Sequence, residues 1–490
     1  MKLILALDAG TTGVRTVAFD DRLNVVDEAY SELTQYFPAP GEVEHDPLEI
    51  ADLAIGTLRA VAQRQRGEGH QIAALGITNQ RETTVGFDRA RGDIFQRAIV
   101  WQDRRTADLC RQLDEQGYAS LVRRTTGLVL DSYFSATKMK WMLDAGVADR
   151  ALAASFATVD TWLLWNLTGG VTGGVFRTEA SNASRTMLMD LNTLEWSPPM
   201  TNLFGVERSM LSDIQPSSSI FGVIAGDVIK ELAGVPITGV LGDQQSALFG
   251  QACFSTGLVK ATYGTGAFIL ANAGDTPPDV VEGLLTTVAW DLGAHGGVTY
   301  ALEGSAFVAG AAVQWLRDLG VIESSSDLEG LALSVASSSG VNFVPAFNGL
   351  GSPFWNAEAR GAITGLTRGV GRGEIARAVI EALAYQVRAM TDAFRDGGVE
   401  VRELRADGGA AAMDLLLQLQ ATNSRVDVRR CSTLEATARG AASIAGLKIG
   451  QWDSLDALSE RWSSTQRCVP EDPLFVDTGY SDWRRALERA

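Results

Sequence analysis

The sequence predicts an α/β protein built from two similar halves. Short apolar runs alternate with amphipathic helical stretches, which is the pattern of a sheet covered by helices. One strand–turn–strand unit opens the chain at residues 3–20 as LILALDAGTTGVRTVAFD, and a second one follows at residues 259–274 as VKATYGTGAFILANAG. A chain of 490 residues is too long for one core, so we expect two or three domains, with a boundary near Gly250 that separates residues 1–250 from residues 251–490.

The composition limits the classes of partner. Acidic residues outnumber basic ones by 59 to 42, and the net charge of −17 argues against nucleic acid or an anionic membrane as a partner. The chain begins with a predicted strand and holds no uninterrupted run of about 18 apolar residues, so we expect a soluble, cytoplasmic protein without membrane insertion. Four cysteines lack a paired short spacing, which predicts reduced, buried thiols and no zinc site; they are Cys110, Cys253, Cys431 and Cys468.

The opening unit places a tight polar turn, residues 8–13, between strands at 3–7 and 14–19. Glycines let the chain bend sharply and present backbone N–H groups outward, and such a nest with two threonine hydroxyls can hold phosphate oxygens. Asp8 ends the first strand, where a carboxylate could hold a magnesium ion that bridges phosphates. An ordinary hairpin is the alternative. The Gly264-Thr265-Gly266 turn of the second unit favours phosphate binding, because two such turns could hold one nucleotide from opposite sides.

The first half continues with a strand at residues 25–33 and a helix after residue 46. Asp46 is expected as the N-cap, Pro47 as the first helical residue and Glu49 as the capping-box partner. Further strands are predicted at 72–77, 84–88, 98–101, 156–159 and 236–241, with helices at 103–117, 135–146 and 161–167. The segment TEASNASR, residues 178–185, is polar and irregular, and its spacing indicates no mechanism.

Polar residues follow three of these strands, at the position where ligands bind in open α/β sheets. Arg81 and Glu82 could donate to and accept from hydroxyl groups, and a surface ion pair is the alternative. Trp101 could form the wall of a pocket or belong to the core. Asp243 is either a helix N-cap or a general base for a substrate hydroxyl, and Gln244 beside it can both donate and accept.

The second half repeats the opening pattern, with strands at 258–263 and 268–272. A strand at 298–302 precedes a helix that starts near Ser305, and a strand at 342–345 precedes a loop rich in glycine and proline. A long amphipathic helix is predicted at 374–394, followed by a strand at 404–406 and a helix from Met413. The glycines of Asp407-Gly408-Gly409 allow close approach of a flat or anionic ligand. A helix rich in small residues is expected at 434–447, and terminal helices at 453–462 and 481–489 on the surface.

These motifs resemble the glycerol kinases of the FGGY carbohydrate kinase family, within the actin/Hsp70/hexokinase-like ATPase superfamily. The resemblance covers nearly the whole chain, and the stretches that carry it include LALDAGTTGVRTVAFD, ALGITNQRETTVGFD, GVLGDQQSALFGQA, TYGTGAFIL and RADGGAAAMDLLLQ. It implies two RNase H-like, actin-like domains that flank a deep cleft. It also implies phosphorylation of glycerol to sn-glycerol 3-phosphate at the expense of ATP, with Mg²⁺ as the accompanying ion.

The resemblance also implies roles for individual residues. Asp243 takes the general-base role, and the residues that match the glycerol site are Arg81, Glu82, Trp101, Tyr133, Asp243, Gln244 and Phe268. The positions that match the nucleotide site are Thr11, Thr12, Gly13, Arg15, Thr265, Gly310, Gln314, Gly409 and Met413, and Asp8 matches the position near the magnesium. Met413 stands where many relatives have asparagine. Residues 224–235 lack the loop that binds fructose 1,6-bisphosphate in some bacterial relatives, so control by that sugar phosphate is not expected.

Three functions are compatible with these motifs. The leading one is phosphorylation of glycerol, the second is phosphorylation of another polyol or sugar by the same family, and the third is a nucleotide-gated binding or scaffold role. The presence of Asp8, Arg15, Asp243 and the glycerol-site set argues against the third. We also expect a homo-oligomer, either a dimer or a tetramer.

Overall fold

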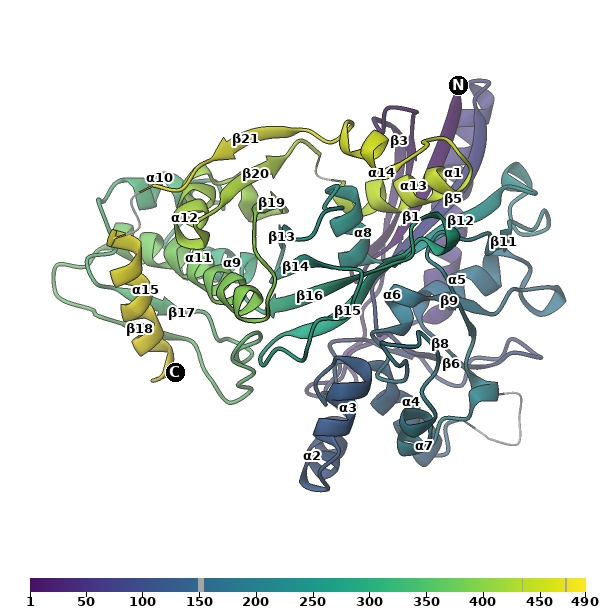
Figure 1. Cartoon of the computed structure of the whole chain (residues 1–490), viewed down its shortest axis with the longest axis horizontal. Helices are drawn as coiled ribbons and strands as arrows, with labels where there is room; N and C mark the ends of the chain where they lie inside the picture. Colours follow the sequence, from purple (N-terminus) through teal and green to yellow (C-terminus); the bar gives the residue numbers. More distant parts are fainter. Residues whose placement is uncertain (149–153, 434, 472–473) are drawn as a thin grey trace.

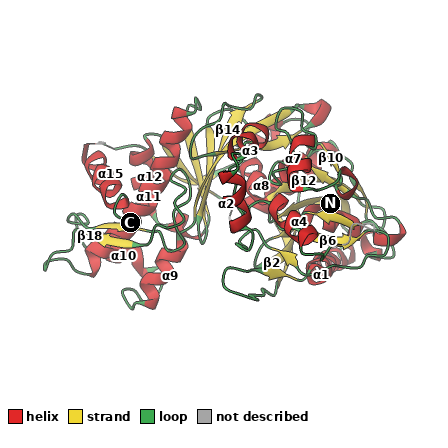
Figure 2. Cartoon of the chain, turned by 90° about the horizontal axis from the view of Figure 1, so that it is seen from below, coloured by secondary structure: helices red, strands yellow, loops and turns green. Residues whose placement is uncertain are grey.

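The computed structural model describes residues 1–148, 154–433, 435–471 and 474–490. Figure 1 shows two lobes, one formed by the earlier part of the chain and the other by the later part, each with its own sheet. Seen from below in Figure 2, helices surround the strands in both lobes. The predicted α/β architecture with two sheet-based halves is confirmed.

The first sheet has six strands in the order β11-β12-β5-β1-β2-β3. β1 pairs antiparallel with β2 and parallel with β5, and β5 pairs parallel with β12. Both faces of β1 are buried: Leu3, Leu5 and Leu7 pack with one core cluster, and Ile4 and Ala6 pack with another, as expected for alternating side chains. The strands are β1 Lys2–Ala9, β2 Gly13–Phe19, β3 Val25–Glu32, β5 Gln71–Asn79, β11 Gly222–Val223 and β12 Pro236–Gly242.

The second sheet has seven strands in the order β15-β16-β14-β13-β19-β20-β21. β13 pairs antiparallel with β14 and parallel with β19, and β19 pairs parallel with β20. The arrangement around β13 therefore repeats the arrangement around β1, so the repeat in the sequence is also a repeat in topology. The strands are β13 Leu258–Tyr263, β14 Ala267–Gly274, β15 Leu285–Asp291, β16 Val298–Ala306, β19 Glu403–Asp407, β20 Asp427–Cys431 and β21 Ser464–Cys468.

One helix from the later part of the chain packs on the first sheet. Helix α13, Ala436–Lys448, lies beside β1 and β5 in Figure 1 and packs against α8, Asp243–Gly250. Glycines permit this close packing: a Cβ on Gly440 would lie 1.8 Å from the Ser246 carbonyl oxygen, and one on Gly76 would lie 2.1 Å from the Ala441 carbonyl oxygen. The boundary at Gly250 stays a prediction, and Leu434, where the small-residue helix was expected to begin, lies outside the described residues.

The remaining elements surround the two sheets. The helices are α1 Pro47–Gly67, α2 Ala107–Glu115, α3 Ala119–Thr126, α4 Ser135–Asp144, α5 Val159–Leu167, α6 Ala180–Ala183, α7 Pro198–Phe204, α9 Gly310–Asp318, α10 Asp327–Leu333, α11 Arg372–Asp396, α12 Asp414–Ser424, α14 Leu455–Ser459 and α15 Leu474–Leu487. Short strand pairs complete the fold; they are β4 Glu44–His45 with β7 Ala98–Ile99, β6 Val85–Asp88 with β8 Ala154–Ala157, β9 Arg177–Glu179 with β10 Asp213–Gln215, and β17 Asn342–Val344 with β18 Ala362–Thr364.

Three local predictions are wrong. The helix expected near Ser305 begins at Gly310, because β16 continues to Ala306 to complete its pairing with β14. Asp46 caps α1 as predicted, but the Glu49 carboxylate accepts from the Thr34 backbone and hydroxyl instead of closing a capping box. The last helix is not confined to the surface, because the Trp483 side chain is fully buried and donates to the Phe343 carbonyl.

The four cysteines are free and buried, as predicted. Within the residues that the structure describes, no helix is long and apolar enough to cross a membrane.

Candidate active site

Three neighbouring strands of the first sheet bring polar groups to one edge. Asn79 at the end of β5 is in register with Ala9 of β1 and with Gly242 of β12, so Asp8, Arg81 and Asp243 lie around the same edge. Arg81 Nε is 3.2 Å from Asp243 Oδ1. Asp243 is the first residue of α8 and Gly242 is its N-cap, which excludes the N-cap alternative for Asp243.

Arg81 and Glu82 do not form a surface ion pair, since both side chains are 2% exposed. Arg81 donates to both oxygens of Glu303 on β16, at 2.6 and 2.9 Å. Arg185 donates to Glu82 at 2.6 Å and to Glu303 at 3.2 Å. These four side chains alternate in charge and join the first sheet to the second one. Burial raises the pKa of Glu82, while Arg81 and Arg185 oppose this effect.

Aromatic rings from both lobes lie beside this charged cluster. The Trp101 ring is 5.5 Å from Tyr133 and 6.3 Å from Phe268, which belongs to β14. The Tyr133 hydroxyl is 3.5 Å from Arg81 Nη2. Lys138, which is fully buried, donates to the carbonyls of Ser132 and Tyr133 at 2.6 and 2.8 Å and thereby fixes the loop that presents Tyr133.

The Gln244 side chain is hydrogen-bonded to a strand of the second sheet. Its side-chain oxygen accepts from Lys260 Nζ of β13, and Lys260 also donates to Thr262 Oγ1 at 3.1 Å. Burial lowers the pKa of Lys260 to about 8, and Asp407, Glu303 and Asp243 oppose this effect. An ammonium group therefore lies behind Gln244, on the side of the second lobe.

The two carboxyl groups at the strand ends are shifted toward protonation. Burial raises the pKa of Asp243, and Arg81 together with the Gln244 backbone N–H opposes it. Burial, Asp243 and Glu435 raise the pKa of Asp8 to about 7, against the effect of Arg15. Negative charge is therefore incompletely balanced around Asp8, and a bound cation would relieve that imbalance.

The donor set around Asp8 fits magnesium rather than a metal held by protein ligands alone. The described residues contain no group of three or more His, Cys, Asp or Glu side chains that could hold a metal. Magnesium commonly takes one or two carboxylates and completes its shell with waters and phosphate oxygens, so one carboxylate beside a turn that is predicted to bind phosphate is sufficient.

The first predicted phosphate turn is accessible at its tip. Thr12 is exposed and Thr11 is partly exposed, and the Thr11 hydroxyl accepts from the Trp101 indole at 2.9 Å. Gly13 is buried, and a Cβ there would lie 2.4 Å from the Tyr30 hydroxyl. Arg15 is paired with Glu435, which precedes α13.

The second predicted turn is also accessible. Thr265 is exposed, and its carbonyl accepts from Ala309 and Ala311 at the start of α9, at 2.8 and 3.1 Å. Gly310 donates to the Gly264 carbonyl at 2.9 Å. These bonds fix the turn against the N-terminus of α9.

The residues expected around the nucleotide base differ in accessibility. Gly409 and Gln314 are exposed, and the Gln314 amide donates to Asp318 at 2.5 Å. Met413 is 8% exposed and packs within the core of the second lobe. Gly409 and Gln314 are thus accessible to a ligand, whereas most of Met413 is buried.

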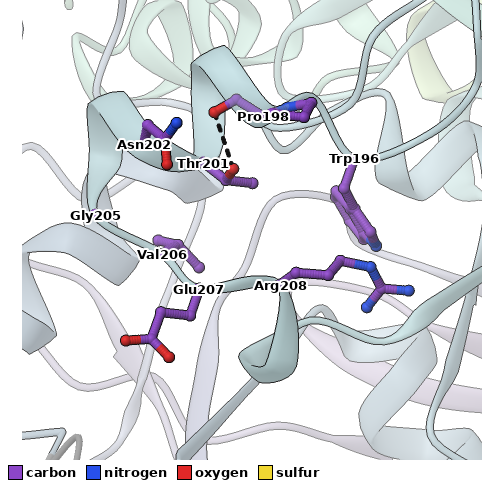
Figure 3. Close-up of a pocket in the computed structure, with 8 residues that line it drawn as sticks. All are labelled: Trp196, Pro198, Thr201, Asn202, Gly205, Val206, Glu207 and Arg208. Atoms are coloured by element: carbon purple, nitrogen blue, oxygen red, sulfur yellow. Dashed lines mark hydrogen bonds between the residues drawn. The ribbon is translucent and has the colours of Figure 1, made fainter.

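A separate pocket of about 450 Å³ lies over α7 in the first lobe (Figure 3). Trp196 and Arg208 stand on one side of it, and the Thr201 hydroxyl donates to the Pro198 carbonyl at 3.1 Å on another. None of its lining residues belongs to the set described above.

Sequence reasoning missed Arg185, Glu303 and Lys260. Each is a charged residue that becomes fully buried. Glu303 and Lys260 stand inside otherwise apolar strands, in the stretches YALEGSAF and LVKATY. A charge within a buried strand needs a partner, and that rule was the available signal for both.

The sequence matches the models of two domains of one protein family. The N-terminal domain of the FGGY family of carbohydrate kinases matches residues 3–250, and the C-terminal domain of that family matches residues 259–449. The chain belongs to the FGGY family of carbohydrate kinases. It is therefore an enzyme of the kinase class.

Individual FGGY relatives resemble this chain over its whole length. The glycerol kinase of Burkholderia ambifaria is 47% identical, with 99% of this chain and 97% of that protein covered. Glycerol kinase 2 of Thermotoga maritima is 46% identical, with 100% and 99% covered. The crystal structure of Plasmodium falciparum glycerol kinase with ADP is 34% identical and covers 100% of this chain and 98% of its own, with a TM-score of 0.93.

Proposed function

We propose that this FGGY kinase transfers the γ-phosphoryl group of ATP to a terminal hydroxyl of glycerol, giving sn-glycerol 3-phosphate. One observation carries the proposal: the Asp243 side chain is 27% exposed, whereas Arg81 beside it is 2% exposed. Asp243 is thus the acidic group of this cluster that a small alcohol can reach. The named glycerol kinases at 46 and 47% identity support glycerol as the substrate.

Each side chain of the cluster has a role in this proposal. Asp243 accepts the proton of the attacking hydroxyl, and a raised pKa brings a carboxylate closer to the range in which a general base works well. Arg81, Glu82, Tyr133 and Gln244 bind the three hydroxyls of glycerol. Trp101 and Phe268 cover its carbon chain, and a substrate that lacks one hydroxyl leaves a buried polar partner unpaired, at a cost of about 1–3 kcal/mol.

The nucleotide lies between the two turns in this proposal. Thr11, Thr12, Gly13 and Arg15 contact phosphates from the first lobe, and Thr265 contacts them from the second. Gly310, Gln314 and Gly409 lie near the ribose and base, and Met413 supports that region from within the core. Asp8 would hold Mg²⁺, which neutralises phosphate charge when it is bound. Phosphoryl transfer needs positioning and charge neutralisation more than covalent chemistry by the protein.

The test is a coupled kinase assay with ATP and a panel of glycerol, erythritol, dihydroxyacetone and xylulose. Glycerol should give the highest kcat/KM, and a much higher value for a longer polyol or a pentulose would favour the second function. Asp243→Asn should lower kcat by about 10²- to 10⁴-fold and change the KM for glycerol only slightly, because the amide keeps its size and place. Asp213→Asn is the matched control, since Asp213 is exposed. Undiminished kcat in Asp243→Asn would exclude the general-base role.

The setting of the reaction belongs to the same proposal. We infer a cytoplasmic enzyme and a homo-oligomer, either a dimer or a tetramer. Cell fractionation tests the location, and light scattering coupled to size-exclusion chromatography tests the oligomeric state. A monomeric mass at micromolar concentration would refute the second inference.

A further inference from the structure

The spacing of the segment TEASNASR suggests no role, yet in the structure its side chains bond to the ends of β5 and β12, which precede Arg81 and Asp243. Glu179 ends β9 and caps α6, and its buried carboxylate accepts from the backbone N–H groups of Ser181 and Asn182 at 2.7 and 2.6 Å. It also accepts from Asn182 Nδ2 at 2.9 Å and from the hydroxyls of Ser181 and Ser217 at 2.5 and 2.6 Å. One carboxylate therefore fixes the whole turn of α6.

Two serine hydroxyls donate to this carboxylate, and each accepts a hydrogen bond from the backbone of a different segment. Ser181 Oγ donates to Glu179 and accepts from the Gly242 backbone N–H at 3.0 Å. Ser217 Oγ donates to Glu179 and accepts from the Asp291 backbone N–H at 3.0 Å. Both side chains are fully buried. Gly242 immediately precedes Asp243, whereas Asp291 ends β15, on the edge strand of the second sheet.

Gly242 has no side chain that could hold its backbone in place. A Cβ at this position would lie 2.7 Å from Arg81 Cδ and 2.9 Å from Gln245 Oε1, so the space beside it is filled by the side chain that contacts Asp243. The bond from its N–H to Ser181 thus holds the backbone at the junction of β12 and α8. The direction of the Asp243 carboxylate depends on that junction, because Asp243 is the next residue.

We propose that Ser181 is a positioning residue for the general base, and that Glu179 fixes its hydroxyl so that it accepts the Gly242 N–H. The proposal rests on the general-base role of Asp243 proposed above. The same segment also holds the neighbouring strand end, because the side-chain amides of Asn182 and Asn79 bond to each other at 3.0 and 3.2 Å. Residues 179–182 therefore support both strand ends that carry the glycerol-site residues.

The experiment compares Ser181→Ala with Ser217→Ala in the full-length enzyme, with ATP and glycerol as substrates. Each variant removes one donor to Glu179 and one acceptor for a backbone N–H, so both should lower the thermal midpoint by a similar amount. Ser181→Ala should also lower kcat by about 10- to 100-fold, the cost of a misplaced catalytic group, while the KM for glycerol changes less than about threefold. Ser217→Ala should retain the wild-type kcat within about twofold.

A graded variant keeps the test decisive if Ser181→Ala does not fold. Ser181→Cys is similar in size but is a weaker hydrogen-bonding group, so its kcat should fall below the wild-type value by about 2- to 10-fold, less than the loss expected for alanine. Equal kcat values for the Ser181 variants and Ser217→Ala would overturn the positioning role alone. Absence of glycerol turnover by the wild type would instead overturn the proposed function and this inference with it.

Discussion

Replacement of Glu303 by glutamine should destabilise the protein and weaken its substrate site together. Glu303 is a fully buried residue of β16, and it accepts from Arg81 at 2.6 and 2.9 Å and from Arg185 at 3.2 Å. Glutamine has nearly the same size, but it lacks the negative charge and presents an N–H₂ group to one of the guanidinium groups. Two buried cations would then lose their shared counter-charge.

The expected loss can be estimated in two ways. Burial alone would raise the pKa of Glu303. The positive charges of Arg185 and Arg81 outweigh this effect and lower the pKa from its ordinary value of 4.5 to about 2. At about 1.4 kcal/mol for each tenfold change in acid strength, this difference corresponds to roughly 3 kcal/mol. Removal of one partner from a buried ion pair independently costs about 3–5 kcal/mol. The carboxylate's contribution is fully present above pH 4.5 and is lost as the pH falls toward 2.

Urea unfolding followed by tryptophan fluorescence measures this loss at pH 7.5. Asp213→Asn is the control, because the Arg208–Asp213 pair has the same 2.6 Å separation as Arg81–Glu303 but its side chains are 55 and 69% exposed. An exposed pair contributes about 0–1 kcal/mol. Glu303→Gln should also raise the KM for glycerol, since Arg81 loses the group that orients it. Equal stability losses in the two variants would refute the reasoning.

Two further variants test other parts of the site and fold. Trp101→Phe removes the 2.9 Å bond from the indole to Thr11 and should raise the KM for ATP by about 2- to 10-fold, as the loss of roughly 0.5–1.5 kcal/mol implies; an unchanged KM for ATP would contradict it. Burial lowers the pKa of His45 from 6.5 to about 4, so the unfolded chain binds a proton first as the pH falls through this range. Between pH 8 and 5 the wild type should therefore lose about 2 kcal/mol more stability than His45→Gln, and equal losses would show that His45 titrates normally.

Local chemistry made much of the candidate site predictable. Arg81 and Asp243 follow apolar strands, and the carboxyl ends of neighbouring parallel strands meet at one edge, so their proximity could be expected. The two glycine-threonine turns were visible as a repeat, and the structure places them in equivalent positions of two sheets whose strand orders correspond, apart from the additional edge strand β15 of the second sheet. The assignment of roles to these residues stays a prediction.

The contacts between the lobes could not be predicted from such rules. Arg81 and Glu303 are 222 residues apart, and no periodicity links them. The capping-box prediction for Glu49 was wrong because a tertiary partner, Thr34, was available. The same reason applies to α6: TEASNASR is polar because its side chains bond to one another and to distant backbone, which a spacing pattern does not reveal.

The charges at the junction of the lobes bear on how the site is assembled. The first lobe supplies Arg81, which follows β5, and Gln244 of α8, and the second sheet supplies their partners Glu303 and Lys260. If the sheets separated, Arg81 would lose its bidentate carboxylate and Gln244 would lose its ammonium group, so both groups would be oriented for substrate only while the lobes are together. Because unpaired buried charges cost several kcal/mol, the contacts that hold the lobes together also orient Arg81 and Gln244, two residues of the proposed glycerol site.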